Sequence, residues 1–418
     1  MDSRKKVLVL GGNVPHRTLI HKLKLKGYFI VLIDYLDNPP AKSVADEHIQ
    51  ISTLDKEKVL EVARKVKPEY IVNVCNDQAI TTAAYVAEKL GVSYPYSYET
   101  SLNITDKGRM KRIMRDNCIP TACFIHVNEE LEGRSVNLNY PLVVKPSDTT
   151  GSKGVKKVTN DKALSMAIKD ALNLSPSHNV IVEEFIPGKE FQIDCFIQDG
   201  LVDVIMIRQK LKFVEGEISS PLGSLIQINL PETERNLLYD IATRISKAFG
   251  INNNTLFMQV IMNGNEINVI EFGVRIGGGW SYKMIKEITG FDYLEAAMNS
   301  ILGIKTPITY SLPQEFYMSN FLFSKEGVFE EVVGLQELKE EGAIDDFEIF
   351  LEKGRFIDGV VANRNRVAIY LVKGKTLNVL FEKVHKVLDV LDIHDCHKNS
   401  LLYKSMYDMA LPVIEKNL

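Results

Sequence analysis

Lys145 and the polar loop after it form the clearest candidate for phosphate binding in the sequence. Lys145 ends an apolar run, residues 142–145, and residues 146–155 are rich in Ser, Thr and Gly. A lysine at a strand end can reach a phosphate oxygen as a point charge, and glycines let backbone N–H groups approach the same anion. The loop is not a Walker motif, because the lysine precedes the glycines. A polar hairpin without a ligand fits this pattern equally well.

A pair of acids lies at the end of the next predicted strand, residues 180–185. Glu183 and Glu184 are followed by Ile186, and Glu190 comes six residues after Glu184. A strand end with free backbone groups and an apolar neighbour suits a purine ring, and a nearby carboxylate can accept hydrogen bonds from both ribose hydroxyls. Two solvent-facing acids on a strand edge are the simpler interpretation of the pair taken alone.

A predicted hairpin brings an amide and a carboxylate together. Two β-type runs, residues 255–262 and 266–271, are joined by an Asn-Gly-Asn turn, which is a strong hairpin signal. Gln259 and Glu271 are then close neighbours, and two oxygen ligands with phosphates completing the octahedron describe a Mg–nucleotide site. Arg275, in the glycine-rich loop that follows, suits a phosphate or carboxylate that gains charge during a reaction. A buried Glu271–Arg275 ion pair is the alternative.

Residues 1–104 have the pattern of a small doubly wound α/β domain. The predicted strands are residues 7–10, 28–33 and 70–74, and the predicted helices are residues 16–26, 56–66 and 79–90. The Gly11-Gly12 turn, with Asp34 at the end of the second strand, suggests a dinucleotide site. The full G-x-G-x-x-G fingerprint is absent, because position 16 is His, and we favour a simple strand-to-helix turn.

The rest of the chain is predicted to be α+β. A helix over residues 105–119 has Thr105 as its expected N-cap, and a long helix covers residues 229–249. The other expected strands are residues 191–197, 201–208, 316–323 and 367–372, and the other expected helices are residues 161–172 and 376–391. We divide the chain into domains at residues 1–104, 105–305 and 306–418.

Composition excludes several classes of protein. The chain has 418 residues, with 50 Lys and Arg against 54 Asp and Glu, so it lacks the basic excess typical of nucleic-acid binding. No apolar run approaches the ~20 residues of a membrane span, and the first one is too short for a signal peptide. Five cysteines without paired spacing indicate reduced thiols. We expect a cytoplasmic protein without nucleic-acid or membrane partners.

Two weaker groups of residues remain. The run from His394 to His397 contains two His, an Asp and a Cys, but no second cluster stands at zinc-finger spacing. We favour an exposed polar turn there over a metal site. Four further cysteines lie beside apolar residues and are expected to be buried or half-buried: Cys75, Cys118, Cys123 and Cys195.

The order and spacing of these motifs resemble the ATP-grasp superfamily, from about residue 7 to residue 372. The likeness is strongest to the branch with biotin carboxylase, carbamoyl-phosphate synthetase, the purine-pathway carboxylases and L-amino-acid ligases. Residues 106–111 look like the D-K-x-x-M-K entry motif of that branch. The resemblance implies a Rossmann-like pre-ATP-grasp domain that does not bind NAD, an ATP-grasp fold with a mobile lid over about residues 121–190, and a small C-terminal α+β region.

By this resemblance, the cofactors are ATP and Mg²⁺, with Mn²⁺ as an alternative metal. Lys107 and Lys145 would hold phosphates, and Arg275 would stabilise an acyl-phosphate intermediate. The other implied ligands are Ser152 and Gly154 for the β- and γ-phosphates, Glu184 and the Ile186 backbone for adenine, Glu190 for ribose, and Gln259 and Glu271 for the metal. Glu183 is a further candidate for binding the nucleotide. The chain departs from the family at Gln259, usually Glu, and at Gly273, usually Asn, which puts a second Mg²⁺ in doubt.

The implied activity is an ATP-dependent ligase that joins a carboxylate to an amine, with amino acids or peptides as the leading small-molecule substrates. A carbamoyl-phosphate-synthetase-like or carboxylase activity is the alternative within the family. A nicotinamide-dependent oxidoreductase explains no residue after 105, and a non-catalytic nucleotide-binding module is the third hypothesis. The resemblance also allows a homodimer.

Overall fold

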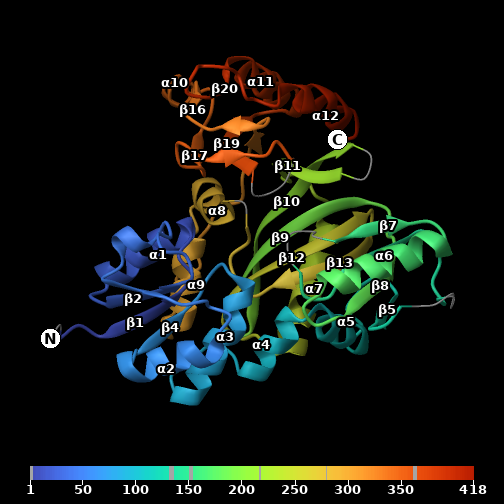
Figure 1. The fold of residues 1–418 in the computed structure, drawn as a ribbon. Coiled ribbons are helices and arrows are strands. Elements are labelled where there is room, and N and C mark those ends of the chain that lie inside the picture. Colours follow the sequence, from blue (N-terminus) through green and yellow to red (C-terminus); the bar gives the residue numbers. More distant parts are fainter. Residues whose placement is uncertain (1–2, 131–135, 150–153, 216–217, 279, 361–364) are drawn as a thin grey trace. The chain divides into compact units, whose positions relative to one another are not determined.

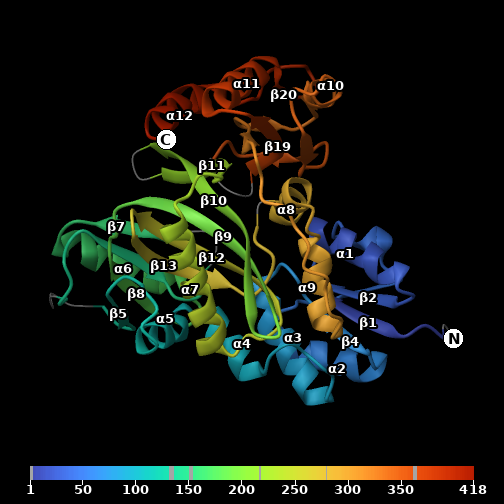
Figure 2. The same ribbon diagram turned by 180° about the vertical axis from the view of Figure 1, so that it is seen from behind.

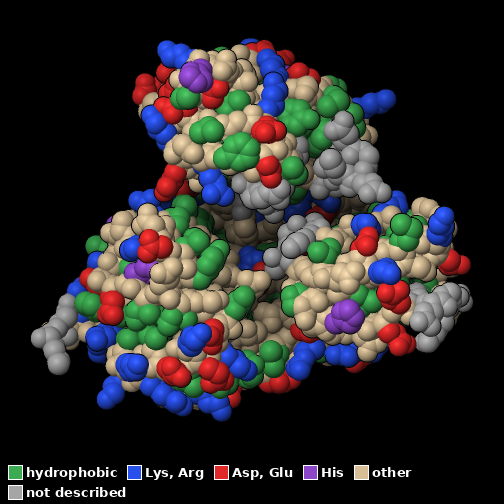
Figure 3. Space-filling model, in the orientation of Figure 1, with side chains coloured by type: hydrophobic (Ala, Val, Ile, Leu, Met, Phe, Trp, Pro, Cys, Tyr) green, Lys and Arg blue, Asp and Glu red, His purple; other side chains and the backbone are tan. Residues whose placement is uncertain are grey.

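The computed structural model describes residues 3–130, 136–149, 154–215, 218–278, 280–360 and 365–418. The chain divides into two compact units (Figures 1 and 2). Unit 1 comprises Met1–Gly188, Ile193–Met206 and Pro231–Ser311, and unit 2 comprises Lys189–Gln192, Ile207–Leu230 and Leu312–Leu418. Acidic and basic side chains are interspersed over the face drawn in Figure 3. Within the described residues, no helix is both long enough and apolar enough to cross a bilayer.

Unit 1 begins with a parallel sheet in the order β3-β2-β1-β4. Its central strands are mostly apolar and are buried after their first residues, as expected when helices cover both faces. Leu8 and Val31 pack against α2 and α3, and Figure 1 shows α1 on the opposite side of the sheet. The elements are β1 (Lys6–Leu10), α1 (Val14–Leu25), β2 (Phe29–Asp34), η1 (Lys42–Val44), β3 (Glu47–Gln50), α2 (Lys56–Val66), β4 (Tyr70–Val72), α3 (Asp77–Leu90) and α4 (Tyr98–Thr105).

This architecture confirms the doubly wound α/β prediction for the first hundred residues. The prediction missed β3, whose sequence Glu-His-Ile-Gln has a single apolar residue because an edge strand is only partly covered. The expected N-cap of the next helix was wrong. Asp106, not Thr105, caps α5 (Lys107–Asp116), because its side chain accepts a hydrogen bond from the Arg109 N–H. Thr105 instead ends α4 and bonds to the Ser101 carbonyl.

A second, antiparallel sheet follows in the order β5-β8-β6-β7. Its strands are β5 (Phe124–Val127), β6 (Leu142–Pro146), β7 (Lys156–Val158) and β8 (Val180–Glu184), and α6 (Asp161–Leu174) packs on one face. Strand β8 is central in this sheet. The interpretation of Glu183 as an acid on a strand edge was therefore wrong, and its side chain is buried.

The remaining elements of unit 1 include the predicted hairpin. The long helix α7 (Glu232–Phe249) precedes β12 (Asn254–Asn263) and β13 (Glu266–Gly273), which pair antiparallel as expected. Helices α8 (Ser281–Thr289) and α9 (Tyr293–Leu302) follow. Strands β9 (Lys189–Gln198) and β10 (Leu201–Glu215) contribute residues to both units, and Glu190 lies at the start of β9.

Unit 2 is built on antiparallel strands in the order β10-β11-β14-β19-β17. These strands are β11 (Ile218–Ile226), β14 (Phe316–Phe323), β17 (Asp346–Ile349) and β19 (Arg366–Gly374). Helix α11 (Leu377–Val390) packs on β14 and β19. The smaller elements are β15 (Gly327–Val328), β16 (Glu331–Val333), α10 (Leu335–Glu340), β18 (Phe356–Ile357), β20 (Asp392–His394) and α12 (Lys404–Lys416).

Candidate functional site

Lys145 lies in a buried cluster of two lysines and one carboxylate. Its ammonium is 2.6 Å from one Glu183 oxygen, and the Lys111 ammonium is 2.5 Å from the other. All three side chains are at most 10% exposed. Burial alone would raise the pKa of Glu183, but the two lysines outweigh it and hold that pKa below its usual value. The cluster therefore keeps one positive charge in excess beneath the polar loop.

Lys111 is the member of this cluster to which the sequence had assigned no role. Burial, followed by repulsion from Lys145, lowers the pKa of Lys111 from 10.5 to about 8. Its ammonium also donates to the Thr121 hydroxyl at 2.8 Å. The signal in the sequence was its spacing from Lys107, because residues four apart on a helix share one face.

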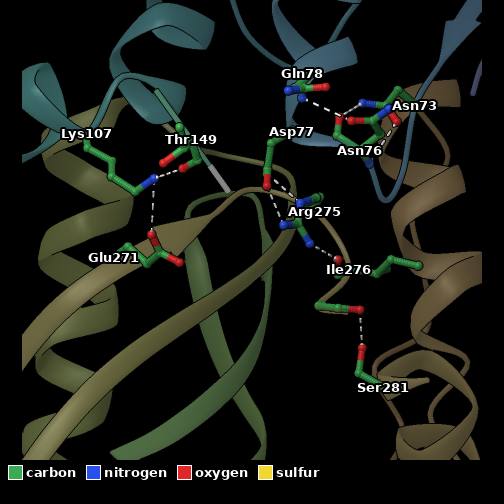
Figure 4. A network of polar contacts seen from close by, with 11 residues as sticks. Asn73, Asn76, Asp77, Gln78, Lys107, Thr149, Glu271, Arg275, Ile276 and Ser281 are labelled. Carbon is green, nitrogen blue, oxygen red and sulfur yellow. Dashed lines mark hydrogen bonds and ion pairs between the residues drawn. The ribbon is translucent and has the colours of Figure 1, made fainter. Parts of the chain in front are cut away.

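Lys107 joins the polar loop to the hairpin (Figure 4). As the first residue of α5, it donates to the Thr149 carbonyl at 2.5 Å, and its ammonium is 3.8 Å from a Glu271 oxygen. Ser152, the next predicted ligand of this loop, lies outside the described residues. Gly154 has φ +79°, and an added Cβ there would lie 2.8 Å from a Leu174 methyl carbon, so the turn requires glycine.

The hairpin places Gln259 directly opposite Glu271, and the predicted proximity of the two side chains is confirmed. Both are half-buried. An amide oxygen and one carboxylate are acceptable ligands for a hard cation, but most of an octahedron must then come from phosphates and water. Within the described part of the chain, no group of three or more His, Cys, Asp or Glu side chains could hold a metal alone. The residues present therefore fit a metal that arrives with a nucleotide.

Gly273 pairs with Phe257 across the hairpin, and the Phe257 ring explains why glycine is required there. A Cβ added at position 273 would lie 2.4 Å from the ring. The same ring lies under the Arg275 guanidinium, 4.7 Å from its centroid. Phe257 thus excludes a side-chain metal ligand at position 273 and supports Arg275 through a cation–π contact.

Replacing Gly273 with Ala should destabilise the protein by about 1–3 kcal/mol, the usual cost of overpacking a fitted core. Urea unfolding would measure the loss. Gly278→Ala is the control, because an added Cβ there meets no atom within 4 Å. Combining Gly273→Ala with Phe257→Leu should recover part of the loss. Equal stability of the Gly273 and Gly278 variants would contradict the steric role of Phe257.

Arg275 is held by Asp77 rather than by Glu271, so the alternative of a Glu271–Arg275 pair was wrong. The Arg275 Nε donates to one Asp77 oxygen at 2.5 Å, Nη2 donates to the other, and Nη1 donates to the Ile276 carbonyl at 2.7 Å (Figure 4). Burial would lower the pKa of Arg275, but Asp77 outweighs it and raises that pKa. The guanidinium is therefore a fixed positive charge.

Asp77 is fixed by the loop between β4 and α3. Asn76 caps α3 by accepting the Gln78 N–H at 3.1 Å, and the Asn73 side chain donates to the Asn76 carbonyl at 2.6 Å. The Ile276 N–H also donates to the Val74 carbonyl at 2.9 Å. Nothing in the sequence pointed to Asp77, since an acid in the first turn of a helix is common.

The predicted adenine and ribose ligands are already engaged in contacts. One Glu184 oxygen accepts both the backbone and side-chain N–H groups of Asn139, at 2.8 and 2.9 Å. Ile186 is half-buried after β8. Glu190, in unit 2, forms ion pairs with Lys210 at 2.7 Å and with Lys212. Burial would raise the pKa of Glu190, but these lysines lower it, so the carboxylate is charged.

Side chains of neighbouring residues fill the space around the Gly11-Gly12 turn. Asp34 accepts the Gly12 N–H at 2.7 Å and the Leu36 N–H at 2.9 Å, so both carboxylate oxygens bind backbone. A Cβ at Gly12 would lie 2.6 Å from Pro39, and one at Gly11 would lie 2.9 Å from the buried His16 ring. This geometry supports the simple strand-to-helix turn over a dinucleotide site.

The remaining candidates have structural explanations. Asp395 accepts the His397 and Asn399 N–H groups in an exposed turn, as favoured for that cluster. The buried or half-buried expectation is confirmed for Cys195, which is buried, and Cys75, which is half-buried. It was wrong for Cys118 and Cys123, which are exposed, because Cys118 lies in the turn after α5 and Cys123 in the connection just before β5.

Comparison with known proteins agrees with this geometry. A family model described as "ATP-grasp domain" matches residues 138–283. The carbamoyl phosphate synthase large chain of Rubrobacter xylanophilus is 25% identical over 295 residues, which cover 68% of this chain and 27% of that protein. The chain thus spans about a quarter of the length of this relative.

Solved structures show the same fold. The L-amino acid ligase of Bacillus licheniformis has a TM-score of 0.77 at 21% identity, covering 94% of this chain and 99% of that one. The biotin carboxylase domain dimer of the Hydrogenobacter thermophilus 2-oxoglutarate carboxylase, in complex with MgADP, ADP and bicarbonate, has a TM-score of 0.72 at 17% identity and covers 96% and 92%. Residues 138–283 therefore match an ATP-grasp domain, and the chain shares its fold with these two solved structures.

Proposed function

We propose that the chain is a carboxylate–amine ligase that uses ATP and forms a C–N bond, with an amino-acid or peptide-type substrate. A carboxylate oxygen attacks the γ-phosphorus of ATP, ADP leaves, and an acyl phosphate forms. An amine then attacks the carbonyl carbon, phosphate leaves, and the amine loses its proton. Such chemistry needs positioning and charge neutralisation more than a covalent nucleophile.

The observation that carries this proposal is the excess positive charge of the Lys145–Glu183–Lys111 cluster. A polyphosphate would neutralise the net positive charge of this cluster. Lys107 adds a further positive charge between the polar loop and Glu271. Gln259 and Glu271 would hold Mg²⁺ against the phosphates, where the ion neutralises charge on the transferring group. Arg275, fixed by Asp77, would bind the acyl phosphate. We retain Ser152, Gly154, Glu184, Ile186 and Glu190 as proposed nucleotide ligands.

A test of this proposal measures ADP release with ATP, Mg²⁺ and pairs of amino acids. Hydroxylamine should trap the acyl phosphate as a hydroxamate when the carboxylate is present without an amine. The carbamoyl-phosphate-synthetase-like or carboxylase alternative is supported by Gln259 and by the similarity to the carbamoyl phosphate synthase large chain. This alternative predicts that ADP release depends on bicarbonate. If neither amino acids nor bicarbonate stimulate ADP release, the ligase proposal is wrong.

Lys111 should give ATP binding a characteristic pH dependence. Its pKa of about 8 means that the folded protein loses this positive charge as the pH rises through that value. A hydrogen bond to a charged group contributes about 1.5 kcal/mol or more, so the KM for ATP should rise about tenfold on the alkaline side. Steady-state kinetics across this range would show the rise.

The Lys111→Met variant provides the matched comparison. It removes the charge permanently but leaves Glu183 paired with Lys145, so its KM should be high and independent of pH over the same range. A variant that keeps the wild-type pH profile would show that another group titrates.

We also propose three domains, residues 1–104, 105–305 and 306–418, a lid over about residues 121–190, and a cytoplasmic, homodimeric enzyme. A biotin carboxylase domain of the same fold is described as a dimer, which supports this assembly. Light scattering on the purified chain would measure its mass in solution.

A further inference from the structure

An acid lies within the polar loop that is predicted to bind phosphate. Asp148 follows Lys145 by three residues, and a free carboxylate at this position would repel a polyphosphate. Both of its oxygens are bound by protein, since one accepts the Ser175 hydroxyl at 2.7 Å and the other accepts the Ser177 N–H at 2.7 Å. Burial would raise the pKa of Asp148, but these two serines outweigh it and hold that pKa below its usual value. The carboxylate is therefore charged and fixed in orientation.

The segment that binds Asp148 is the turn at residues 175–179, between α6 and β8. The turn has hydrogen bonds of its own. The His178 N–H donates to the Ser175 carbonyl at 3.0 Å, and the Asn179 N–H donates to the Ser175 hydroxyl oxygen at 3.1 Å. The Ser147 N–H also donates to the Asn179 carbonyl, at 3.0 Å. The turn thus holds both residues with which the polar loop leaves β6.

The next residue of the loop, Thr149, holds Lys107 (Figure 4). Its carbonyl accepts the Lys107 ammonium at 2.5 Å. A lysine side chain is long and flexible, so it needs a fixed partner to place its charge before a ligand binds. A carbonyl is neutral and orients the ammonium without cancelling its charge, whereas Lys145 is held by the carboxylate of Glu183. The Glu271 carboxylate, at 3.8 Å from Lys107, is beyond hydrogen-bond distance. The position of the Thr149 carbonyl therefore sets the position of the Lys107 charge.

We propose that Asp148 is a positioning residue for Lys107. By binding the turn at residues 175–179, it fixes the start of the polar loop and places the Thr149 carbonyl where it holds the Lys107 ammonium for the nucleotide phosphates. A neutral side chain at position 148 would form weaker hydrogen bonds to the turn, which explains why an acid stands in a phosphate loop. This inference rests on the proposed nucleotide site and adds to it a residue that need not touch the nucleotide.

A binding measurement tests the proposal without turnover. MgADP is titrated calorimetrically into the full chain. Asp148→Ala should weaken binding about tenfold, the usual effect of losing a hydrogen bond to a charged group. Asp148→Asn keeps one acceptor oxygen and should fall between wild type and the alanine variant, which it replaces if that variant does not fold. In the ADP-release assay, the KM for ATP should rise by the same factor with little change in kcat, because Lys107 contacts the phosphates before and during transfer.

A double-mutant cycle separates positioning from a general loss of structure. In a Lys107→Met background, Asp148→Ala should weaken MgADP binding less than about threefold, because no ammonium remains to be placed. A purely structural role of Asp148 would give the same tenfold loss in both backgrounds. Asp161→Asn is the control. This exposed acid accepts the Tyr140 hydroxyl at 2.6 Å, at the opposite end of β6 from Asp148, and the variant should bind like wild type.

The possible outcomes distinguish this inference from the proposed function. Equal MgADP affinity of wild type and Asp148→Ala, or an equal loss in both backgrounds, would overturn the positioning role and leave the nucleotide site in place. Absence of MgADP binding in wild type would reject the nucleotide site and this inference with it. The expected pattern of binding, without ADP release from any substrate pair, would reject the ligase function and keep the role of Asp148.

Discussion

Lys145→Met should reduce ATP turnover by about 100-fold or more, because a preorganised charge contact to the transferring phosphoryl group is lost. Methionine fills nearly the same volume, and Glu183 keeps Lys111 at 2.5 Å, so the buried carboxylate stays paired. The fold should therefore survive, and circular dichroism with thermal unfolding would confirm it. ADP release at saturating ATP measures the effect.

The matched control is Lys162→Ala, on the neighbouring helix α6, where the lysine is exposed. This variant should have wild-type turnover. Near-normal turnover of Lys145→Met would show that the cluster beneath the polar loop does not contact the phosphates. A variant that loses its fold would be replaced by Lys145→Arg, which keeps the charge and should retain more activity than the methionine.

The parts of the site that sequence could predict depend on local pattern. The turn at residues 263–265 sets the register of β12 and β13, and that register places Gln259 opposite Glu271. Lys145 could likewise be placed at a strand end, because the apolar run before it and the glycines after it mark the strand and the loop. These inferences needed only neighbours within a few residues.

The partners of these residues could not be predicted in the same way. Arg275 and Asp77 are 198 residues apart, and Lys145 and Glu183 are 38 apart, so only the tertiary fold joins them. The burial of Glu183 follows from the central position of β8, which strand propensity does not reveal. The local sequence pattern therefore identified the candidate site residues. Their acidic partners, which set their charge and orientation, could be identified only from the tertiary structure.

Glu271→Gln should remove nearly all ligase activity, a loss on the order of 100-fold or more, because the hairpin then has no negatively charged ligand for Mg²⁺. Gln259 is neutral, and Phe257 excludes a side chain at position 273, so no nearby group on the hairpin replaces the carboxylate. The measurement is the Mg²⁺ dependence of ADP formation. Glu266→Gln is the control, since this exposed acid begins the same strand.

Two comparisons distinguish the role of Glu271 as a metal ligand from its role in the ion pair with Lys107, whose ammonium lies 3.8 Å from a Glu271 oxygen. Loss of a metal ligand should be partly rescued by high Mg²⁺, whereas loss of the ion pair should not. Gln259→Glu should remain active and reach half-maximal rate at lower Mg²⁺, because a carboxylate binds this hard ion more tightly than an amide. If Glu271→Gln keeps full activity at low Mg²⁺, the metal lies elsewhere, and the role of the hairpin would be limited to positioning Lys107.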